Sequence, residues 1–560
     1  MCGIFGIINN KSIDIKYIFD AFSKIKPRGP DRSKIIYADD YFLGFHRLAL
    51  NCLSIDGDQP FILVDKLTKK SFYLLINGEI YNYKELANEY NIDLNLHSSD
   101  CSIILDLYKK LDYDFDKLNK KINGEYAMTI IELIDNNITN IKLSTDPLSV
   151  RPLFYGYSKN NVFGFSSKLE SLSMLKKFDG NIKRLDQNEI IDFTFKTNNL
   201  IKTYYKKPIL NLDETISYPL TTDYTNITNI FINCVRKRLF TDRKLGCLLS
   251  GGLDSSLVCA VASKLLYEIN PNLKLNTFSI GMKNGTDIEY AEKVANHLNN
   301  LYNNINHTTV YFTKEEALNT INDVLSVTET WDLTTNRASV GQYLLAKYIN
   351  ENTDIKVVLN GDGADEAQMG YLYFYKYPNL IEAQLNHYKL LDNIHLFDGL
   401  RVDRCLSMNG LEARVPFLDE EFVDYMRSKP ASWKVPTKER MEKYFIRDAF
   451  SSLYSNLLPH DVLWRKKEAF SDGVSAVDES WYSMVQTYMN EKIDDEQFEL
   501  YTELIKNTEF INTKEAYYYW IHFTNSYDET NLNVIPYYWL PEWSNGIKEP
   551  SARVLNVYST

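Results

Sequence analysis

The sequence has 560 residues, a length that predicts two or more domains. Hydrophobic residues make up 44% and charged residues 24% of the chain, as in ordinary globular proteins, and the formal net charge of −12 excludes a broad nucleic-acid-binding surface. Because the chain has no apolar run of ~18 residues, no signal-peptide pattern and only scattered cysteines without CxxC pairs, we expect a cytoplasmic protein without membrane contact.

The first part of the chain is predicted to form short β-strands separated by turns. The clearest runs cover residues 41–50, 71–76 and 124–132. Residues 198–217 are polar, contain one proline and precede another, so this stretch is predicted to be a linker. The tail after residue 527 carries several prolines and is predicted to be irregular.

From about residue 221, predicted strands and helices alternate. The predicted strands cover residues 244–249, 275–282, 308–312 and 355–359, and the predicted helices cover residues 255–266, 287–298, 314–327 and 339–349. This alternation predicts a doubly wound parallel sheet whose ligand-binding loops lie at the carboxyl ends of the strands. Glycine-rich loops at 250–256 and 361–366 both follow predicted strands, and such loops commonly bind phosphates.

The second residue, Cys2, is a candidate nucleophile. Removal of Met1 would leave a thiol and a free α-amino group on the same residue. This amine has a pKa of ~7.7–8.0, so a useful fraction is neutral near pH 7 and can act as a base. A buried, inert thiol is the alternative, since cysteine is often buried. We expect the mature chain to begin at Cys2.

Short motifs along the chain resemble those of one family. In chain order they are MCGIFGI (1–7), KPRGPDRS (26–33), HRLAL (46–50), NGEIYNY (77–83), SSDC (98–101), DPLSVRPLFYG (146–156), SGGLDSS (250–256), TWDLTTNRAS (330–339), GDGADE (361–366), GYLYF (370–374), LEARVPFLD (411–419) and WRKKEAFSDGV (464–474). Each motif alone is modest evidence, but their order and spacing resemble the glutamine-dependent asparagine synthetases nearly end to end.

The resemblance implies two domains and a tail. An N-terminal nucleophile (αββα) amidotransferase domain is expected over residues 1–205, an ATP-pyrophosphatase-type domain with a doubly wound parallel sheet over 206–525, and an irregular tail over 526–560. The implied reaction makes asparagine from aspartate, glutamine and ATP through β-aspartyl-AMP, with Mg²⁺ as cofactor. Ammonia released from glutamine would pass internally to the second site. A homodimer is a further possibility.

The resemblance also implies roles at the first site. Cys2 would attack the carboxamide of glutamine, and Asn77 and Gly78 would donate to the tetrahedral oxygen. The implied glutamine-binding residues are Arg47, Asn77, Glu79 and Asp100. Arg47 would bind the α-carboxylate and the two acids the α-ammonium, although a plain surface ion pair is the alternative for Arg47.

The second site would bind ATP and aspartate. The implied ATP-binding residues are Leu249, Ser250, Gly251, Gly252, Asp254, Ser255, Ser256, Ile280, Asn360 and Gly361. Mg²⁺ prefers hard oxygen ligands, here Asp254 and Asp365. The implied aspartate and pyrophosphate site consists of Arg337, Asp362 and Lys467, with the last two also catalytic. A solvated lysine at 467 and a turn residue at 365 are the alternatives.

Several positions depart from the family pattern. The usual SGEG is NGDG at 360–363, so Asp362 replaces a glutamate and is one methylene shorter. Proton transfer needs a reach of ~2.6–3.2 Å, so the change is expected to slow this step or draw in water. The other departures are Ser98, Ser102, Thr145, Ser149 and Ser167. These departures cast doubt on the interface between the domains and on the packing around the internal ammonia tunnel, more than on the role of Cys2 as the nucleophile.

Functions from two classes remain: the enzyme just described, and a catalytically weakened relative that acts as a regulatory or binding scaffold. Intact residues at both implied sites favour the enzyme. An amidotransferase for another carboxylate is a third possibility. Other amidotransferases with an N-terminal cysteine would lack the nucleotide loop, and a β-lactam synthetase should not retain the nucleophilic cysteine.

Overall fold

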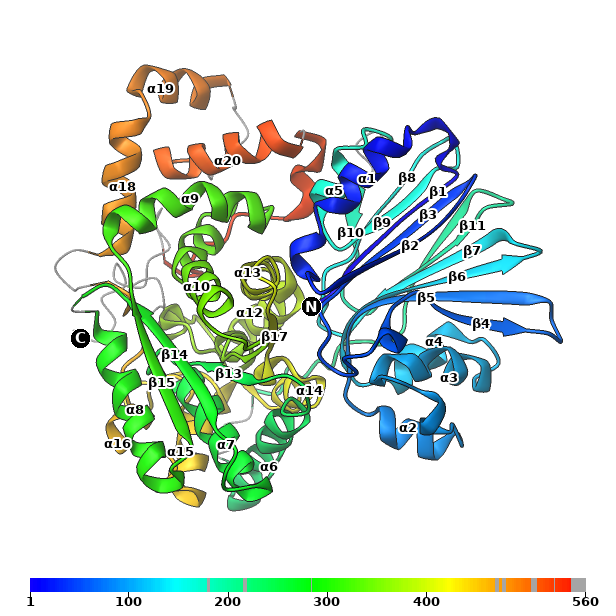
Figure 1. The fold of residues 1–560 in the computed structure, drawn as a ribbon. Helices are drawn as coiled ribbons and strands as arrows, with labels where there is room; N and C mark the ends of the chain where they lie inside the picture. Colours follow the sequence, from blue (N-terminus) through cyan, green and yellow to red (C-terminus); the bar gives the residue numbers. More distant parts are fainter. Residues whose placement is uncertain are drawn as a thin grey trace.

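The computed structural model describes residues 1–178, 182–214, 219–283, 285–468, 473–475, 480–504, 511–527 and 529–544. Two antiparallel sheets formed by the first part of the chain lie beside a parallel sheet surrounded by helices (Figure 1). The predicted fold class, an αββα domain followed by a parallel α/β domain, is confirmed. Residues 215–217 of the predicted linker, and residues 528 and 545–560 of the predicted tail, lie outside the described residues.

The first domain is a sandwich of two six-stranded sheets. One sheet has the order β10-β8-β9-β1-β3-β2 and contains β1 (Gly3–Ile8), β2 (Arg32–Ala38), β3 (Tyr41–Arg47), β8 (Phe154–Tyr157), β9 (Phe163–Ser166) and β10 (Ile182–Arg184). The other has the order β12-β11-β7-β6-β5-β4 and contains β4 (Phe61–Asp65), β5 (Lys70–Ile80), β6 (Gly124–Ile134), β7 (Asn137–Thr145), β11 (Glu189–Thr194) and β12 (Asn199–Tyr204). Apolar side chains of both sheets, such as Ile4, Leu43, Leu75 and Ile131, form one buried cluster between them.

Helices cover the outer faces of this sandwich. The helices are α1 (Ile15–Ser23), α2 (Tyr83–Glu89), α3 (Ile104–Lys110), α4 (Phe115–Lys121) and α5 (Leu169–Ser173). Leu107 of α3 and Leu118 of α4 pack with Leu74 of β5, while Phe22 of α1 packs with Phe5 of β1. The two helical layers therefore leave β1 buried along its whole length.

The start of the predicted linker is wrong, because Asn199–Tyr204 form β12, which pairs antiparallel with β11. β12 lies at the edge of its sheet, and five of its six residues are exposed. An edge strand with exposed side chains carries no apolar periodicity, so its sequence reads as a polar connection.

The second domain is built on a five-stranded parallel sheet of order β15-β14-β13-β16-β17. Its strands are β13 (Leu245–Leu248), β14 (Leu275–Gly281), β15 (Ile305–Tyr311), β16 (Val357–Leu359) and β17 (Glu412–Arg414). The chain adds strands on opposite sides of β13, so the crevice beyond β13 and β16 is the position where such sheets bind ligands.

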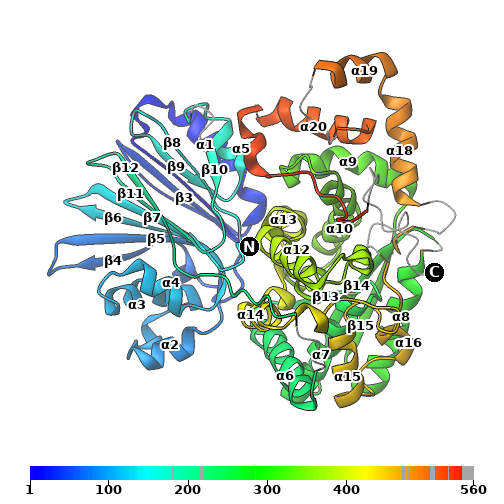
Figure 2. The ribbon, with the colours of Figure 1, turned by 180° about the vertical axis from the view of Figure 1, so that it is seen from behind.

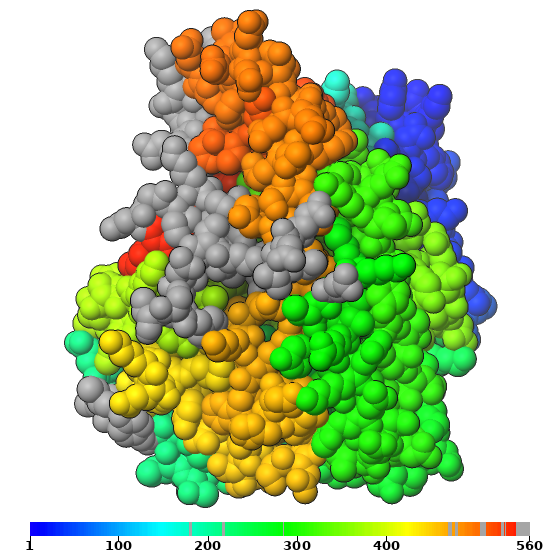
Figure 3. Space-filling model, turned by 90° about the vertical axis from the view of Figure 1, so that its left-hand side faces the viewer, coloured from blue at the N-terminus to red at the C-terminus, as the bar shows by residue number. Residues whose placement is uncertain are grey.

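The helices of this domain surround the sheet. They are α6 (Thr221–Lys237), α7 (Leu253–Ile269), α8 (Thr286–Tyr302), α9 (Lys314–Thr328), α10 (Leu333–Asn352), α11 (Ala364–Gln368), α12 (Leu380–Asn393), α13 (Asp398–Ser407), α14 (Glu420–Ser428), α15 (Tyr444–Leu453) and α16 (His460–Leu463). α16 lies near α8, where Lys293 pairs with Asp461, and Figure 3 shows these orange and green segments on one face. Three later helices, α18 (Trp481–Lys492), α19 (Asp495–Leu504) and α20 (Lys514–Tyr527), are followed by the 3-10 segment η10 (Glu529–Val534).

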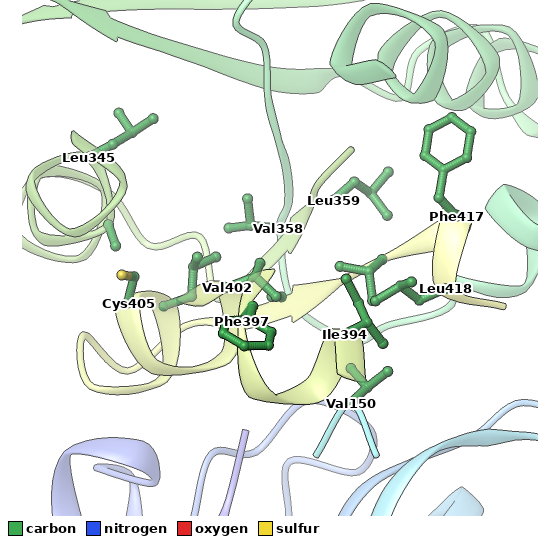
Figure 4. Close-up of a cluster of buried hydrophobic side chains, with 14 of the residues drawn as sticks. Val150, Leu345, Val358, Leu359, Ile394, Phe397, Val402, Cys405, Phe417 and Leu418 are labelled. Carbon is green, nitrogen blue, oxygen red and sulfur yellow. The ribbon is translucent and has the colours of Figure 1, made fainter. Parts of the chain in front are cut away.

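Helix α13 lies beside the N-terminus of the chain in both ribbon views (Figures 1 and 2). The Arg28 guanidinium spans the two domains, with Nη1 and Nη2 2.8 and 3.0 Å from the carboxylate oxygens of Asp403. An apolar contact accompanies this pair, because Val150 of the first domain points toward Ile394 and Phe397 of the second (Figure 4). The domains therefore share one continuous buried surface.

Two candidate active sites

Cys2 immediately precedes the central strand β1 and is half-buried. Its backbone N–H donates to Asn77 Oδ1 over 2.7 Å, and its Sγ lies 3.7 Å from the carbonyl oxygen of Leu48. Burial raises the pKa of the Cys2 thiol. The thiol is therefore protonated near pH 7 and needs a nearby base before it can act as a nucleophile.

Asn77 and Gly78 lie on β5, beside Cys2. Asn77 Nδ2 is buried and has no hydrogen-bond partner among the described residues, so this donor is available to a ligand oxygen. A Cβ atom on Gly78 would lie 2.1 Å from the carbonyl oxygen of Glu125, so only glycine fits between β5 and β6. A free amide donor next to a thiol is the arrangement that an oxyanion requires.

A buried pair of carboxylates lies on the same side of β5. Asn51 Nδ2 donates to Glu79 Oε2 and lies 3.5 Å from Asp100 Oδ1, while Asp100 Oδ2 accepts the Ile80 N–H over 2.7 Å. Burial and the neighbouring Asp100 raise the pKa of Glu79 well above its usual value. Two close carboxylates favour a cationic ligand such as an ammonium group.

Arg47 is also buried, and its guanidinium has protein partners. Nη1 lies 2.7 Å from Asp58 Oδ1, and Nη2 donates to the carbonyl oxygen of Cys52. The predicted contact of Arg47 with an α-carboxylate stays a prediction. Asn51 and Asp58 could not be predicted from the sequence, since single polar residues in a loop carry no periodic pattern.

The second domain contributes a charge to this first site. Arg414, on β17, lies with Nη2 3.4 Å from Glu79 Oε2 and donates from Nε to Glu412 Oε1 over 2.8 Å. Its carbonyl oxygen accepts the Asn360 N–H over 2.9 Å. Arg414 therefore contacts both Glu79 and the loop that follows β16.

The second candidate site begins with the loop between β13 and α7. Ser250 and Ser255 hydroxyls lie 2.9 Å apart, and Gly252 N–H donates to Ser250 Oγ over 3.3 Å. Gly251 has a φ of 75°, and a Cβ there would lie 2.5 Å from the Ala291 nitrogen, so the turn requires glycine. The loop ends at the N-terminus of α7, a favourable place for phosphate.

A cavity of ≈ 240 Å³ opens above this loop. Among the residues predicted for the second site, those that line it are Leu249, Ser250, Gly252, Asp254, Ser255, Ile280, Arg337, Asn360, Gly361, Asp362, Asp365 and Lys467. Gly251 and Ser256 do not line it, and Ser256 is completely buried. The cavity is also lined by polar and basic residues that lie outside the quoted motifs, among them Gln342, Arg401 and Lys443.

Two lysines and two aspartates form one cluster in the cavity. Lys443 Nζ lies 2.5 Å from Asp254 Oδ2 and 2.6 Å from Asp365 Oδ1, and Lys467 Nζ lies 2.6 Å from Asp365 Oδ2. Burial alone would raise the pKa of Asp365, but the two lysines outweigh it and hold that pKa well below its usual value. The two lysines therefore favour the anionic form of Asp365.

The two aspartates fit a magnesium ion that also binds phosphate. Asp254 Oδ1 is buried and has no hydrogen-bond partner among the described residues. Within that same part of the chain, no group of three or more His, Cys, Asp and Glu residues could hold a metal. Mg²⁺ commonly uses one or two carboxylates together with substrate phosphates, so two aspartates are enough.

Asp362 is held by three donors. Arg401 Nη2 lies 2.8 Å from Oδ1, while Asn360 Nδ2 and Gln342 Nε2 donate to Oδ2 over 3.0 and 3.2 Å. Burial raises the pKa of Asp362 although Arg401 opposes the shift. The three hydrogen-bond donors therefore hold the shorter side chain of Asp362 in place.

A second carboxylate pair lies beside Arg401. The Tyr371 hydroxyl lies 2.6 Å from Glu366 Oε1 and 2.8 Å from Asp398 Oδ2. Burial and Asp398 raise the pKa of Glu366 well above its usual value, while that of Asp398 is lowered, so Glu366 is the member of the pair that is protonated first.

Both parts of the chain match families of known proteins. Residues 1–216 match the family described as "Glutamine amidotransferase domain", and residues 226–391 and 382–517 match "Asparagine synthase". The asparagine synthetase [glutamine-hydrolyzing] of Gallus gallus is 36% identical over 579 residues, covering 100% of this chain and 99% of the relative. The chain belongs to the glutamine-hydrolysing asparagine synthetase family.

Other members of the family are equally similar along their whole length. The enzyme of Bos taurus is 36% identical over 582 residues, and the probable asparagine synthetase of Acanthamoeba polyphaga mimivirus is 36% identical over 581 residues. The predicted family is thus confirmed. None of the described helices has the length and apolar character needed to cross a membrane.

The departures from the asparagine synthetase pattern make local hydrogen bonds. Ser98 Oγ donates to the Asp56 carbonyl over 2.8 Å, Thr145 Oγ1 to that of Asp186 over 3.2 Å and Ser149 Oγ to that of Leu185 over 3.3 Å. Ser167 Oγ accepts the Ile4 N–H over 3.1 Å, and Ser102 caps the turn that begins at Ser99. These side chains are accommodated within the first domain.

Two of the residues predicted for the synthetase site need separate mention. Arg337 lines the cavity, but its Nη2 lies 2.6 Å and its Nε 3.2 Å from the carboxylate of Glu515 on α20. Its role toward aspartate or pyrophosphate stays a prediction. The motif that contains Lys467 includes residues 469–472, which lie outside the described residues.

Proposed function

We propose that the chain makes asparagine from aspartate, glutamine and ATP, with its two sites acting in series. The observation that carries the proposal is the cluster of Asp254, Lys443, Asp365 and Lys467 beyond the parallel strands, in the same chain as the Cys2–Asn77 pair. The first arrangement suits pyrophosphate release from ATP and the second suits amide hydrolysis.

At the first site, removal of Met1 would free the Cys2 amine, which accepts the thiol proton. The thiolate then attacks the glutamine carboxamide, and Asn77 Nδ2 with the Gly78 N–H stabilises the oxyanion. Collapse of this intermediate releases ammonia and leaves a thioester, which water hydrolyses to glutamate. The free Asn77 donor and the buried Glu79–Asp100 pair support these roles, with the pair on the α-ammonium and Arg47 on the α-carboxylate.

At the second site, the β-carboxylate of aspartate attacks the α-phosphorus of ATP, and pyrophosphate leaves. The loop 250–256 would hold the phosphates, and Lys443 and Lys467 would neutralise charge that develops on the leaving group. Mg²⁺, held by Asp254 and Asp365, would supply Lewis-acid stabilisation of the phosphate oxygens. Charge balance supports this assignment, since phosphate oxygens can replace the two aspartates as the partners of the two lysines.

The acidic and basic residues around Arg401 would bind aspartate. A substrate with one ammonium and one free carboxylate needs both an anionic and a cationic partner. The Glu366–Asp398 pair and Arg401 provide these two signs within one wall of the cavity. Asp362 would accept the proton that ammonia loses after it attacks the acyl adenylate.

Helix α13 supports an internal route for ammonia. Asp403 pairs with Arg28, whose Nε donates to the Cys2 carbonyl over 3.1 Å, and Arg401, two residues earlier, pairs with Asp362. The apolar contact of Val150 with the second domain (Figure 4) would favour neutral ammonia over ammonium.

We also propose domain limits of 1–205 and 206–525, followed by a tail over 526–560. All seven cysteines are free thiols, which supports a cytoplasmic, reducing location. A homodimer stays a prediction.

Product analysis with glutamine, aspartate, ATP and Mg²⁺ tests the proposal. We expect asparagine, AMP and pyrophosphate in equal amounts, with glutamate formed in parallel. Replacement of aspartate by another carboxylic acid should abolish pyrophosphate release. Pyrophosphate release that requires a different acid would identify another amidotransferase, and no release with any acid would identify a scaffold.

A further inference from the structure

Gln342 is a polar residue in the synthetase cavity to which none of the predicted roles applies. It lies on α10, is only 5% exposed and lines the cavity beside Asp362. Its amide nitrogen donates to Asp362 Oδ2 over 3.2 Å. Because a carboxylate can only accept, the –NH₂ end of the amide must face Asp362 and the carbonyl end must face elsewhere.

The carbonyl end of Gln342 has no protein partner. No described residue donates to Oε1, although this atom is buried. A buried acceptor left without a donor is costly, so such an atom in a ligand cavity indicates a ligand or water that donates to it. The ligand must supply an N–H or O–H group close to Asp362.

The side of the cavity on which Gln342 lies indicates which ligand this is. Ser339 lies one turn earlier on the same face of α10, and its carbonyl oxygen accepts from Cys405 Sγ over 3.7 Å. Cys405 and Val402 belong to α13, the helix that contacts the first domain, and both are completely buried. Gln342 therefore lies where the apolar side of α13 meets the cavity, the side from which ammonia would arrive.

On the basis of the proposed function, we infer that Gln342 Oε1 and Asp362 together bind the ammonia that attacks the acyl adenylate. Ammonia has three N–H groups and one lone pair. Two N–H groups donate to Gln342 Oε1 and to the Asp362 carboxylate, which leaves the lone pair free to face the acyl carbon. The C–N bond forms, the bond from the acyl carbon to the AMP oxygen breaks with its electron pair going to AMP, and one proton passes to Asp362.

The same geometry explains why Asp362 works in this chain. Its carboxylate is shorter than the glutamate of the family pattern, and Asn360 and Gln342 both donate to the same oxygen. These two amides fix the carboxylate, while the free carbonyl of Gln342 adds a second acceptor for ammonia. Gln342 thus has a positioning role toward Asp362 and a binding role toward the nucleophile.

The test compares Gln342→Met with Gln384→Met in ammonia-dependent synthesis. Gln384, on α12, is a matched control because it is equally buried, donates to a protein partner and also has an unpaired Oε1, but does not line the cavity. We expect Gln342→Met to raise the KM for ammonia and to lower asparagine formed per pyrophosphate, each by about tenfold. Pyrophosphate release and glutaminase activity should stay within about twofold of wild type.

A second variant, Gln342→Glu, separates binding from packing. When protonated, the glutamate can donate to Asp362 and still offer a carbonyl oxygen, so it copies the glutamine. Because two adjacent carboxylates share one proton at low pH and repel when both ionise, the variant should approach wild-type ammonia use at low pH and lose it as the pH rises. A purely structural glutamine predicts no such loss.

The outcomes separate this inference from the proposed function. If wild type makes no asparagine from ammonia, the proposed function fails. If wild type makes asparagine and Gln342→Met keeps the KM for ammonia and the product ratio of the Gln384→Met control, the ammonia site is overturned. Should Gln342→Met not fold, a ratio of Gln342→Glu to wild-type synthesis that does not change with pH overturns it instead.

Discussion

Replacement of Arg414 by Met should weaken glutamine binding although Arg414 belongs to the synthetase domain. At 3.4 Å, and with an effective dielectric constant of about 20, the attraction between Arg414 and Glu79 is about 5 kcal/mol. Even one third of this value corresponds to more than tenfold in affinity, since about 1.4 kcal/mol is a factor of ten. We therefore expect the KM for glutamine to rise at least tenfold at pH 7.

The pH dependence of this effect has a definite sign. Burial and Asp100 raise the pKa of Glu79, and Arg414 lowers it. Without Arg414 the pKa of Glu79 rises further, so at any given pH a larger fraction of Glu79 is neutral and less able to bind an α-ammonium group. A higher pH restores the anion, so the KM for glutamine of Arg414→Met should fall as the pH increases.

Glutaminase assays from pH 6 to 9 measure this effect, with ammonia-dependent synthesis as the internal control. Arg427→Met is the matched variant, because Arg427 is also a buried arginine of the second domain but pairs with Asp392. Arg414→Lys keeps the charge and should lie between wild type and Arg414→Met. Equal KM values for glutamine in Arg414→Met and Arg427→Met at every pH would refute the reasoning.

Four further outcomes are expected. The intact mass of active protein should correspond to a chain that begins at Cys2. Retained Met1 would contradict the role of the Cys2 amine as the base. Cys2→Ala should abolish glutaminase activity but leave ammonia-dependent synthesis within about twofold, because the sites are separate; equal loss of both would count against separation. Asp365→Asn should reduce synthesis at least about 10²-fold while glutaminase continues, and unchanged Mg²⁺ dependence would exclude this ligand. Asp362→Glu should slow ammonia-dependent synthesis by about tenfold, because an added methylene must displace three donors; a faster rate would show that the shorter side chain limits turnover.

The parallel sheet could be predicted because its strands are short apolar runs. The predicted strands 244–249 and 355–359 contain β13 and β16, whose residues are mostly buried. Strand β17 was missed because it reads Glu-Ala-Arg, and its charged side chains are buried only through pairs such as that between Glu412 and Arg414. A strand stabilised by ion pairs has no hydrophobic pattern.

In the candidate sites, too, some residues could be predicted from the sequence and others could not. Asp365 and Lys467 could be assigned to one site because both lie in motifs that resemble those of the family, and in the structure the two side chains form an ion pair. Lys443 and Gln342 lie outside every quoted motif, and they reach the cavity only through tertiary packing. Their roles depend on distances to other segments, which one sequence without geometry does not contain.

Helix α13 has a thermodynamic consequence for the two sites. Asp403 holds Arg28 and through it the Cys2 carbonyl, while Arg401 holds Asp362. A ligand that shifts Arg401 would also shift Asp403, two residues further along the same helix, and with it the contacts of Cys2. Linkage requires the effect to be reciprocal: if aspartate and ATP tighten glutamine binding by some factor, glutamine tightens their binding by the same factor. Glutamine would then be held most strongly when an acceptor for its nitrogen is already in place.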